Sequence, residues 1–252
     1  MLKRAYFLAF FISLFSSQAF AQTIAIMGAM DAEIEKLLPE IRDSRQYVKA
    51  NNTYYTGTIS GKDVVVVRSG VGKVNAAVTT QTLVCDFDTS AIIFTGIAGA
   101  ASPDLEVADV VIASALVQHD VDLTAFGAPL GLIDGYEDRL FKVDENLKTL
   151  AEKAAEKIVG EKRTHSGIIA TGDQFIADKK HVAFLREEFE AMAVEMEGAA
   201  VAQVAEMYGV PLVVIRTVSD KADGSAHMVY NEAKQVTADN SVAIVLEMLK
   251  NL

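Results

Sequence analysis

Three acidic residues stand at positions in the sequence that suggest acid–base chemistry. Glu33 lies in GAMDAE directly after the strand-like run TIAIMG, Glu197 follows AMAVEM, and Asp220 ends LVVIRTVSD. Most acidic side chains are solvated, but a carboxylate at the end of an apolar run can be partly buried. Partly buried carboxylates that are brought together can perform general acid–base cleavage of a glycosidic bond. We therefore expect these three residues to share a site.

Glycine-rich segments also follow apolar runs. They read SGVGKVNA, TGIAGA and TGDQFI. Glycines at a helix N-terminus can present backbone N–H groups to a phosphate. However, the chain contains neither GxxxxGK[ST] nor a GxGxxG that opens a helix after a strand, which excludes a P-loop and a dinucleotide fingerprint. We interpret the glycines as positions where the backbone closely approaches a small neutral ligand.

The elements that must position these residues alternate between strand and helix patterns. Strands are expected at 23–28, 54–60, 64–69, 91–96, 109–114, 164–172, 191–196 and 211–219, and helices at 30–41, 72–87, 145–159, 185–190, 198–209 and 231–252. Residues 115–141 are expected to form a long loop-rich stretch. This alternation predicts a single α/β domain with a central mixed sheet flanked by helices. Ligands of open α/β sheets bind at the carboxyl ends of the strands, where the acids and glycines lie.

The composition narrows the classes of function. The 252 residues include 34 acidic and 23 basic ones, for a formal charge of −11. This balance argues against a nucleic-acid partner, because phosphate contacts need clustered Lys and Arg. A single cysteine excludes an intrachain disulfide and a multi-cysteine zinc site, and we expect Cys85 to be a small buried hydrophobe.

The first 21 residues have the pattern of a signal peptide. Lys3 and Arg4 precede an apolar run at 5–15, and Ala19-Phe20-Ala21 supplies a small-x-small cleavage pattern. The run is shorter than the roughly 20 residues that span a bilayer, which argues against a membrane anchor. Cleavage near Ala21 leaves 231 residues with 21 basic and 34 acidic ones, a net charge of −13. We therefore expect a domain at 22–252 that is exported, to the periplasm or the medium.

The motifs together resemble the 5′-methylthioadenosine/S-adenosylhomocysteine nucleosidases of the nucleoside phosphorylase superfamily. The resemblance rests on IAIMGAMDAEIEKL, SGVGKVNAA, TGIAGA, HDVDLTAFG, TGDQFI, VEMEGAAVA and PLVVIRTVSDKAD, in this order. It implies a nucleoside phosphorylase-like fold and hydrolysis of the N-glycosidic bond of 5′-methylthioadenosine, S-adenosylhomocysteine or both. It also implies an adenine nucleoside as the small-molecule partner, no cofactor or metal, and a homodimer.

The resemblance assigns catalytic roles to two of the acids. Glu33 looks like the base that activates the attacking water, and Asp220 like the acid that protonates N7 of adenine, held by Ser219. Asp220 must then be protonated when it acts, which requires a pKa raised by desolvation, whereas Glu33 must be ionised.

The resemblance also implies contacts with the substrate. Glu197 and Met196 would contact the ribose, Phe175 would stack on adenine, and the backbone of Ile176 would read its edge. The remaining positions implied at the site are Met30, Gly99, Arg216, Tyr230 near the 5′ substituent, and Leu123 and Phe126 from the partner subunit.

Two other functions stay open on the sequence. A phosphorylase of the same fold would need cations for phosphate, but residues 28–33 hold two carboxylates and no base, with Arg216 and Arg68 as the remaining candidates. An exported nucleoside-binding protein without catalysis is the other alternative, and the presence of all three acids argues against it. TGIAGA departs from the commoner TGSAGG of the family, with Ile97 in place of a serine and Ala100 in place of a glycine.

Overall fold

A computed structural model describes the backbone of residues 22–222 and 226–252, with side chains described except at 223–236. The signal peptide predicted at 1–21 and the side chain of Tyr230 therefore lie outside the described residues. None of the helices within the described ranges has the length and apolar character needed to cross a membrane.

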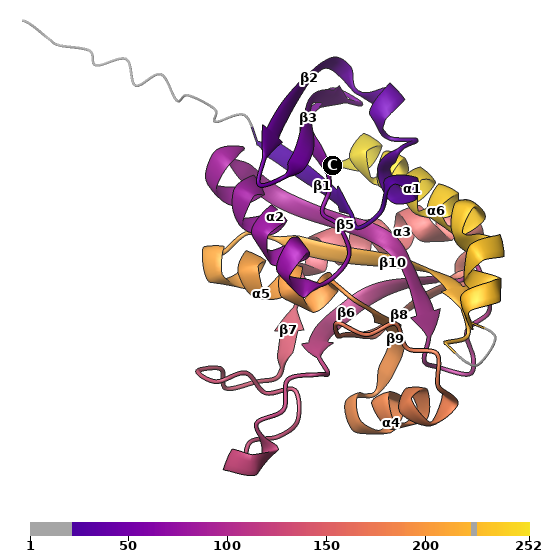
Figure 1. Cartoon of the computed structure of the whole chain (residues 1–252). Coiled ribbons are helices and arrows are strands. Elements are labelled where there is room, and N and C mark those ends of the chain that lie inside the picture. The colour runs from indigo at the N-terminus through magenta and orange to yellow at the C-terminus, as the bar shows by residue number, and fades with distance from the viewer. Residues whose placement is uncertain (1–21, 223–225) are drawn as a thin grey trace, which may run out of the picture.

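Strands and helices alternate along most of the chain (Figure 1). The strands are β1 Thr23–Gly28, β2 Arg42–Lys49, β3 Asn52–Ile59, β4 Lys62–Arg68, β5 Thr89–Ala100, β6 Val110–Gln118, β7 Leu140–Lys142, β8 Thr164–Thr171, β9 Ala191–Glu195 and β10 Leu212–Asp220. The helices are α1 Asp31–Ile34, α2 Lys73–Asp86, α3 Glu145–Val159, α4 Lys179–Phe189, α5 Gly198–Tyr208 and α6 Ala226–Asn251.

Five of the strands close into a ring. β10 pairs with β5 in parallel and with β6 in antiparallel fashion, and β6, β8 and β9 lead in that order back to β5. β1, β4, β3 and β2 extend the sheet outward from β5. Parallel and antiparallel pairs thus occur in one sheet, which confirms the predicted mixed α/β fold.

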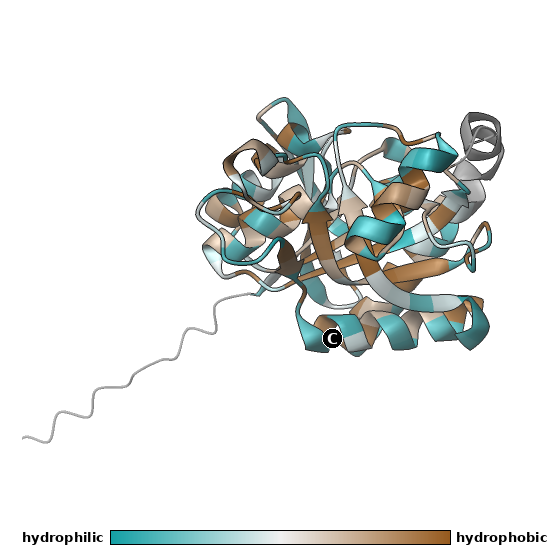
Figure 2. Ribbon diagram, turned by 90° about the horizontal axis from the view of Figure 1, so that it is seen from below, coloured by the Kyte–Doolittle hydropathy of each residue, from teal (hydrophilic) through white to brown (hydrophobic). Residues whose placement is uncertain are grey.

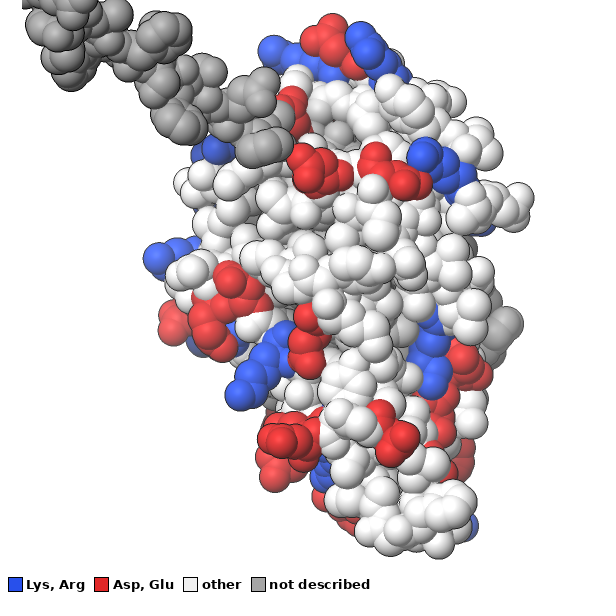
Figure 3. Space-filling model, turned by 90° about the vertical axis from the view of Figure 1, so that its left-hand side faces the viewer, with Lys and Arg blue, Asp and Glu red and all other residues white. Residues whose placement is uncertain are grey.

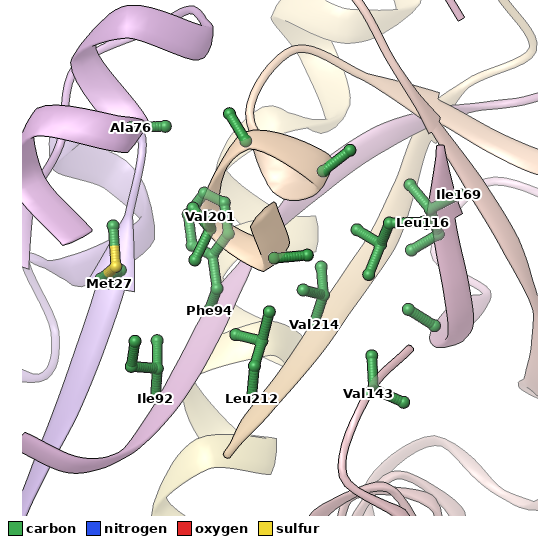
Figure 4. Packing of buried hydrophobic residues seen from close by; sticks show 14 of the residues in the cluster. Met27, Ala76, Ile92, Phe94, Leu116, Val143, Ile169, Val201, Leu212 and Val214 are labelled. Atoms are coloured by element: carbon green, nitrogen blue, oxygen red, sulfur yellow. The ribbon is translucent and has the colours of Figure 1, made fainter. Parts of the chain in front are cut away.

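Helices cover both faces of the sheet. On one face, α2 and α5 pack over a cluster of buried side chains that includes Phe94, Val201 and Val214 (Figure 4). On the other face, α1, α3 and α6 enclose a second cluster around Ile26 and Ile215. Figure 2 shows apolar strands at the centre, with hydrophilic positions gathered on the surrounding helices and loops. Burial of this aliphatic surface is the main source of stability and holds the strand ends in place.

The helix predicted at 30–41 is wrong in its length. Only Asp31–Ile34 is α-helical, and Leu38–Glu40 forms a separate 3₁₀ turn. Pro39 lacks a backbone N–H and restricts Leu38 before it, so a helix cannot run unbroken to residue 41, although α1 already ends at Ile34. The short α1 keeps Glu33 within the first turn after β1, at the end of the sheet.

Four other points of the prediction need correction. β5 continues through TGIAGA to Ala100, where a loop was expected, and β6 continues to Gln118, which shortens the predicted 115–141 loop. The edge strand β2 was not predicted because its eight residues are all exposed and carry no apolar alternation. Cys85 is exposed rather than buried, with Sγ 3.7 Å from the hydroxyl of Tyr208.

Candidate active site

A cavity of about 150 Å³ opens at the carboxyl ends of the strands, where the sequence predicts a site. Its lining comes from the segments after β1, β4 and β8 and from the ends of β5, β9 and β10. The lining residues are Ala29, Met30, Glu33, Val71, Ile97, Ala98, Gly99, Phe175, Val194, Glu195, Met196, Glu197, Ser219 and Asp220. The three acids singled out in the sequence therefore do share one cavity.

Glu33 is held by three backbone donors. Its Oε2 accepts from the N–H groups of Ala29 at 2.6 Å and Met30 at 2.8 Å, and its Oε1 accepts from Ile97 at 3.0 Å. The side chain is only 2% exposed, and this burial raises its pKa above the ordinary 4.5, opposed by Arg216 and by the three N–H groups. Glu33 is thus an oriented carboxylate whose affinity for a proton is increased.

Glu197 is the second carboxylate at the cavity and precedes α5. Its Oε1 accepts from the backbone N–H of Gly72 at 2.8 Å. Burial and the neighbouring carboxylate of Glu195 raise the pKa of Glu197 to about 8, with Arg216 acting in the opposite direction. A hydroxyl-rich ligand that donates to Glu197 would favour its ionised form.

Arg216 lies beneath the cavity instead of lining it as predicted. Its side chain is 1% exposed, donates to Glu195 Oε2 at 2.8 Å and stacks over Phe94 at 4.1 Å from the ring centre. Glu195 also accepts from the hydroxyl of Thr171 and from the backbone N–H groups of residues 197 and 198. The buried Arg216–Glu195 pair therefore lies next to Glu197, and Glu195 holds the backbone of residue 197 by a hydrogen bond.

Asp220 ends β10 and is 2% exposed. Its Oδ2 accepts from the hydroxyl of Ser219 at 2.8 Å, and its Oδ1 accepts from the N–H of Ala222 at 2.7 Å. The Ser219 hydroxyl also lies 3.2 Å from the carbonyl oxygen of Ala98. These contacts fix the carboxyl group of Asp220 on the cavity wall.

Two glycines of TGIAGA lie against the two acids. A Cβ on Gly96 would sit 2.6 Å from Glu33 Oε1, and one on Gly99 would sit 2.9 Å from the Ala222 Cβ and 3.2 Å from Asp220 Oδ1. The sequence predicts close approach to a ligand. The structure shows that these glycines also make room for the carboxylates themselves.

Other predicted site residues occupy two further places. Ile176 lines a small adjoining cavity together with Gly99 and Phe175. Leu123 and Phe126 line a separate surface hollow, and Phe126 is 88% exposed. Within this chain, Leu123 and Phe126 therefore do not join the cavity that holds the acids.

The sequence analysis assigned no role to several residues of the cavity wall. The most important is Glu195, which flanks Met196 in VEME, so its position in that motif was a usable signal. Val71, in SGVGKVNA, and Ile97, in TGIAGA, belong to the glycine-rich segments that drew attention for their glycines. Ala29, Ala98 and Val194 carry no chemical signal that a single sequence reveals.

The cavity is poor in positive charge. None of the described residues that line it is Lys or Arg. Arg68 instead pairs with Asp31 at 3.3 Å and lines a different hollow. Over the described ranges, no group of three or more His, Cys, Asp or Glu is placed to hold a metal ion. The cavity therefore suits a largely neutral ligand better than a phosphate dianion.

The chain resembles known proteins over nearly all of its length. Residues 23–250 match the phosphorylase superfamily. The aminodeoxyfutalosine nucleosidase of Campylobacter jejuni is 42% identical over 91% of this chain and 99% of that protein. The 5′-methylthioadenosine/S-adenosylhomocysteine nucleosidase of Lysinibacillus sphaericus is 41% identical over 91% and 99%. The Helicobacter pylori enzyme of the same name, crystallised with butyl-thio-DADMe-Immucillin-A, superimposes with a TM-score of 0.88 at 37% identity, covering 92% of this chain and 100% of that one.

Proposed function

The chain belongs to the 5′-methylthioadenosine/S-adenosylhomocysteine nucleosidase family of the phosphorylase superfamily, and on this premise we propose how its cavity cleaves a nucleoside. The enzyme hydrolyses the N-glycosidic bond of 5′-methylthioadenosine, S-adenosylhomocysteine or both, releasing adenine and the 5-thioribose. The observation that carries the proposal is that Glu33, Glu197 and Asp220 line one cavity.

Cleavage requires a proton for the leaving base and a nucleophile for the sugar. As the bond between C1′ and N9 breaks, its electron pair moves into adenine, and Asp220 supplies a proton to N7. Water forms the new bond to C1′ and transfers a proton to Glu33. The ribose passes through an oxocarbenium-like state, which the nearby carboxylates stabilise.

Substrate contacts follow from the arrangement of the cavity wall. Phe175, half exposed at the mouth, stacks on adenine, and the backbone of Ile176 contacts its edge. Glu197 accepts from the 2′ and 3′ hydroxyls, and Met196 packs against the sugar. Met30 and Gly99 complete the wall.

Charge favours water over phosphate as the nucleophile. In their ionised forms, Glu33, Glu195 and Glu197 of the cavity wall would repel a phosphate dianion. The two arginines that could oppose this repulsion are Arg216 and Arg68, and each is paired with an acidic residue. Phosphorolysis by a phosphorylase of the same fold is therefore the less favoured reaction.

The deciding experiment follows adenine release from methylthioadenosine by residues 22–252, with and without phosphate. Equal rates of adenine release in both buffers, with methylthioribose as the second product, support hydrolysis. Strict dependence on phosphate would identify a phosphorylase, and binding without turnover would identify a nucleoside-binding protein.

The substituent at the 5′ position is the main question of specificity. The relative from Campylobacter jejuni is an aminodeoxyfutalosine nucleosidase, so aminodeoxyfutalosine belongs in the assay beside methylthioadenosine and adenosylhomocysteine. The same acids would cleave all three nucleosides, because the reacting bond joins ribose to adenine in each. Ratios of kcat/KM among the three would rank the natural substrates.

A second copy of the chain would complete the 5′ end of the site. We assign Leu123 and Phe126 to the cavity of a partner subunit, because they lie apart from the acids of their own chain and Phe126 is exposed. Burial against a partner would remove this large aromatic side chain from water.

Export is the remaining part of the proposal. The basic, apolar and small-residue pattern of residues 1–21 supports cleavage near Ala21 and a periplasmic or secreted enzyme. Expression of the full chain in a bacterial host, cell fractionation and N-terminal sequencing test this directly. A mature protein that begins at Gln22 outside the cytoplasm is the expected result, and an intact N-terminus on cytoplasmic protein would refute it.

A further inference from the structure

Three segments meet beside the cavity through a cluster of charged residues that the proposed mechanism does not use. Lys73 begins α2, Asp120 follows the end of β6, and Asp173 lies in the loop after β8. We refer to them as the Lys73–Asp120–Asp173 cluster. The three positions are far apart in the sequence, so their meeting depends on the folded sheet.

Each member of the cluster contacts the other two. Lys73 Nζ lies 2.5 Å from Asp120 Oδ1, and the backbone N–H of Lys73 donates to Asp173 Oδ1 at 2.8 Å. The backbone N–H of Asp173 donates to Asp120 Oδ2 at 3.0 Å. Both Lys73 and Asp120 have side chains less than one-fifth exposed, so solvent screens this pair less than it screens a surface ion pair.

The cluster adjoins both ends of the proposed nucleoside site. Gly72, directly before Lys73, donates its backbone N–H to Glu197. Asp173 stands two residues before Phe175, and the Gly172 N–H donates to the carbonyl oxygen of Glu195 at 3.1 Å. The N-terminus of α2 is thereby connected to the ribose carboxylate and to the loop that carries the adenine contact.

The same loop lies closely over a buried histidine. A Cβ on Gly172 would come within 2.3 Å of His119 Nε2, so the backbone has no space for a side chain there. His119 itself precedes Asp120. The loop therefore packs against His119, and hydrogen bonds within the Lys73–Asp120–Asp173 cluster hold it in place.

From this geometry we infer that Lys73 and Asp120 are positioning residues, which hold the 172–176 loop in the conformation that places Phe175 against adenine. The inference rests on the proposed function, because it assumes that the cavity takes an adenine nucleoside. Neither side chain lines the cavity, so they act through Asp173 and the loop. Burial alone would raise the pKa of Asp120, but Lys73 and the Asp173 N–H lower that pKa below its ordinary value. The ion pair is therefore retained in mild acid.

The test separates base binding from sugar binding. Lys73→Met and Asp120→Asn are each expected to raise the Kd for adenine about fivefold to tenfold in titration calorimetry. In steady-state kinetics, KM should rise by a similar factor, while kcat changes less than about twofold. Inhibition by 5-methylthioribose should stay unchanged, because the backbone contact of Gly72 with Glu197 does not need either side chain. The double variant should bind adenine no more weakly than the single variant with the lower affinity, since both single variants lose the same ion pair.

Lys49→Met is the matched control. Lys49 pairs with Asp86 at 2.9 Å, but both side chains are about two-fifths exposed, and neither residue lines the cavity. If Lys73→Met does not fold, Asp120→Asn, which is nearly isosteric, decides the question alone. Unchanged adenine affinity in a folded variant, or equal losses for adenine and methylthioribose, would overturn the inference. Failure of the parent enzyme to bind or release adenine would instead reject the proposed function.

Discussion

Asp220 and Glu33 are both almost fully buried, yet their surroundings differ in kind. Glu33 accepts from three backbone N–H groups, which favour a negative charge, whereas the contacts of Asp220 include the Ser219 hydroxyl and the backbone N–H of Ala222. The three N–H groups suit Glu33 to the role of an ionised base, and the burial of Asp220 beside the Ser219 hydroxyl is consistent with the role of an acid.

Replacing the proposed acid should separate binding from turnover. Asp220→Asn keeps the size of the side chain and an acceptor for the Ser219 hydroxyl, but it has no proton to transfer. We expect kcat to fall about 100-fold to 10,000-fold with substrate affinity retained. Steady-state kinetics and analogue binding measure the two effects, and full activity in this variant would contradict the assignment.

Acid should reduce activity through Glu33 and Glu197. Burial raises both pKa values, to about 8 for Glu197, and both side chains are proposed to act in their ionised form. As the pH falls below these raised values, each carboxylate takes up a proton and its function is lost. We expect kcat/KM to increase from about pH 6 to about pH 8, because this parameter reports ionisations of the free enzyme. A kcat/KM profile that is flat over this range in the parent enzyme would contradict the expectation. The Glu197→Gln variant should lack the share of the pH dependence that comes from ionisation of Glu197.

The acids could be found from the sequence, but their electrostatic partners could not. Glu33 and Glu197 follow apolar runs and Asp220 ends one, which marks the edge of the sheet. Arg216 lies in the same kind of run, and nothing local shows that its side chain turns beneath the cavity toward Glu195. That direction is decided by a partner 21 residues away in sequence.

At the scale of elements, β5 supplies the surface against which Glu33 is held. We expect Gly96→Ala to disturb this contact, since the added methyl group would lie 2.6 Å from Glu33 Oε1. The carboxylate must then leave its backbone donors, so kcat should fall at least about tenfold while the fold is retained. Circular dichroism and steady-state kinetics measure the two properties.

A glycine in a different part of the sheet provides the control for that experiment. Gly61→Ala lies in the β3–β4 turn, where nothing stands within 4 Å of an added Cβ, although its positive φ of 78° makes some loss of stability expected. Full activity in Gly96→Ala would show that Glu33 does not depend on this contact with β5.

Element boundaries were the least predictable part of the fold. The TGIAGA segment has turn-like composition, but pairing with β10 and, at its end, with β9 keeps it extended to Ala100. The opposite occurs at residues 30–41, where helical spacing is interrupted by Pro39. In both places tertiary pairing or a single restricted residue overrides the local pattern.

At the scale of the molecule, the exposed apolar residues favour a dimer. Val71, Val74 and Val78 are exposed at the start and along one side of α2, and Figure 3 shows a broad band with few charges on the side where α2 and α5 lie. We expect a mass of two mature chains by light scattering. Phe126→Ser should raise KM for 5′-substituted nucleosides while adenine binding is unchanged, and a monomer with full activity would contradict this expectation.

The alternation of strands and helices was sufficient to predict an α/β fold with a mixed sheet, since each element has a clear apolar pattern. It could not reveal that the sheet closes on itself. The closure depends on β10 pairing with both β5 and β6, and identical apolar runs would fit an open sheet equally well.

This closed ring also fixes the order in which the protein can be completed during synthesis. β10 is the last strand of the chain, and it fills the space between β5 and β6. Until it is made, the parts of β5 and β6 that pair with β10 lack this partner, and unpaired strand edges favour the aggregation of incomplete chains. Because β10 ends on Asp220, the strand that closes the sheet also brings the proposed proton donor to the cavity, and a nascent chain that stops before β10 lacks both.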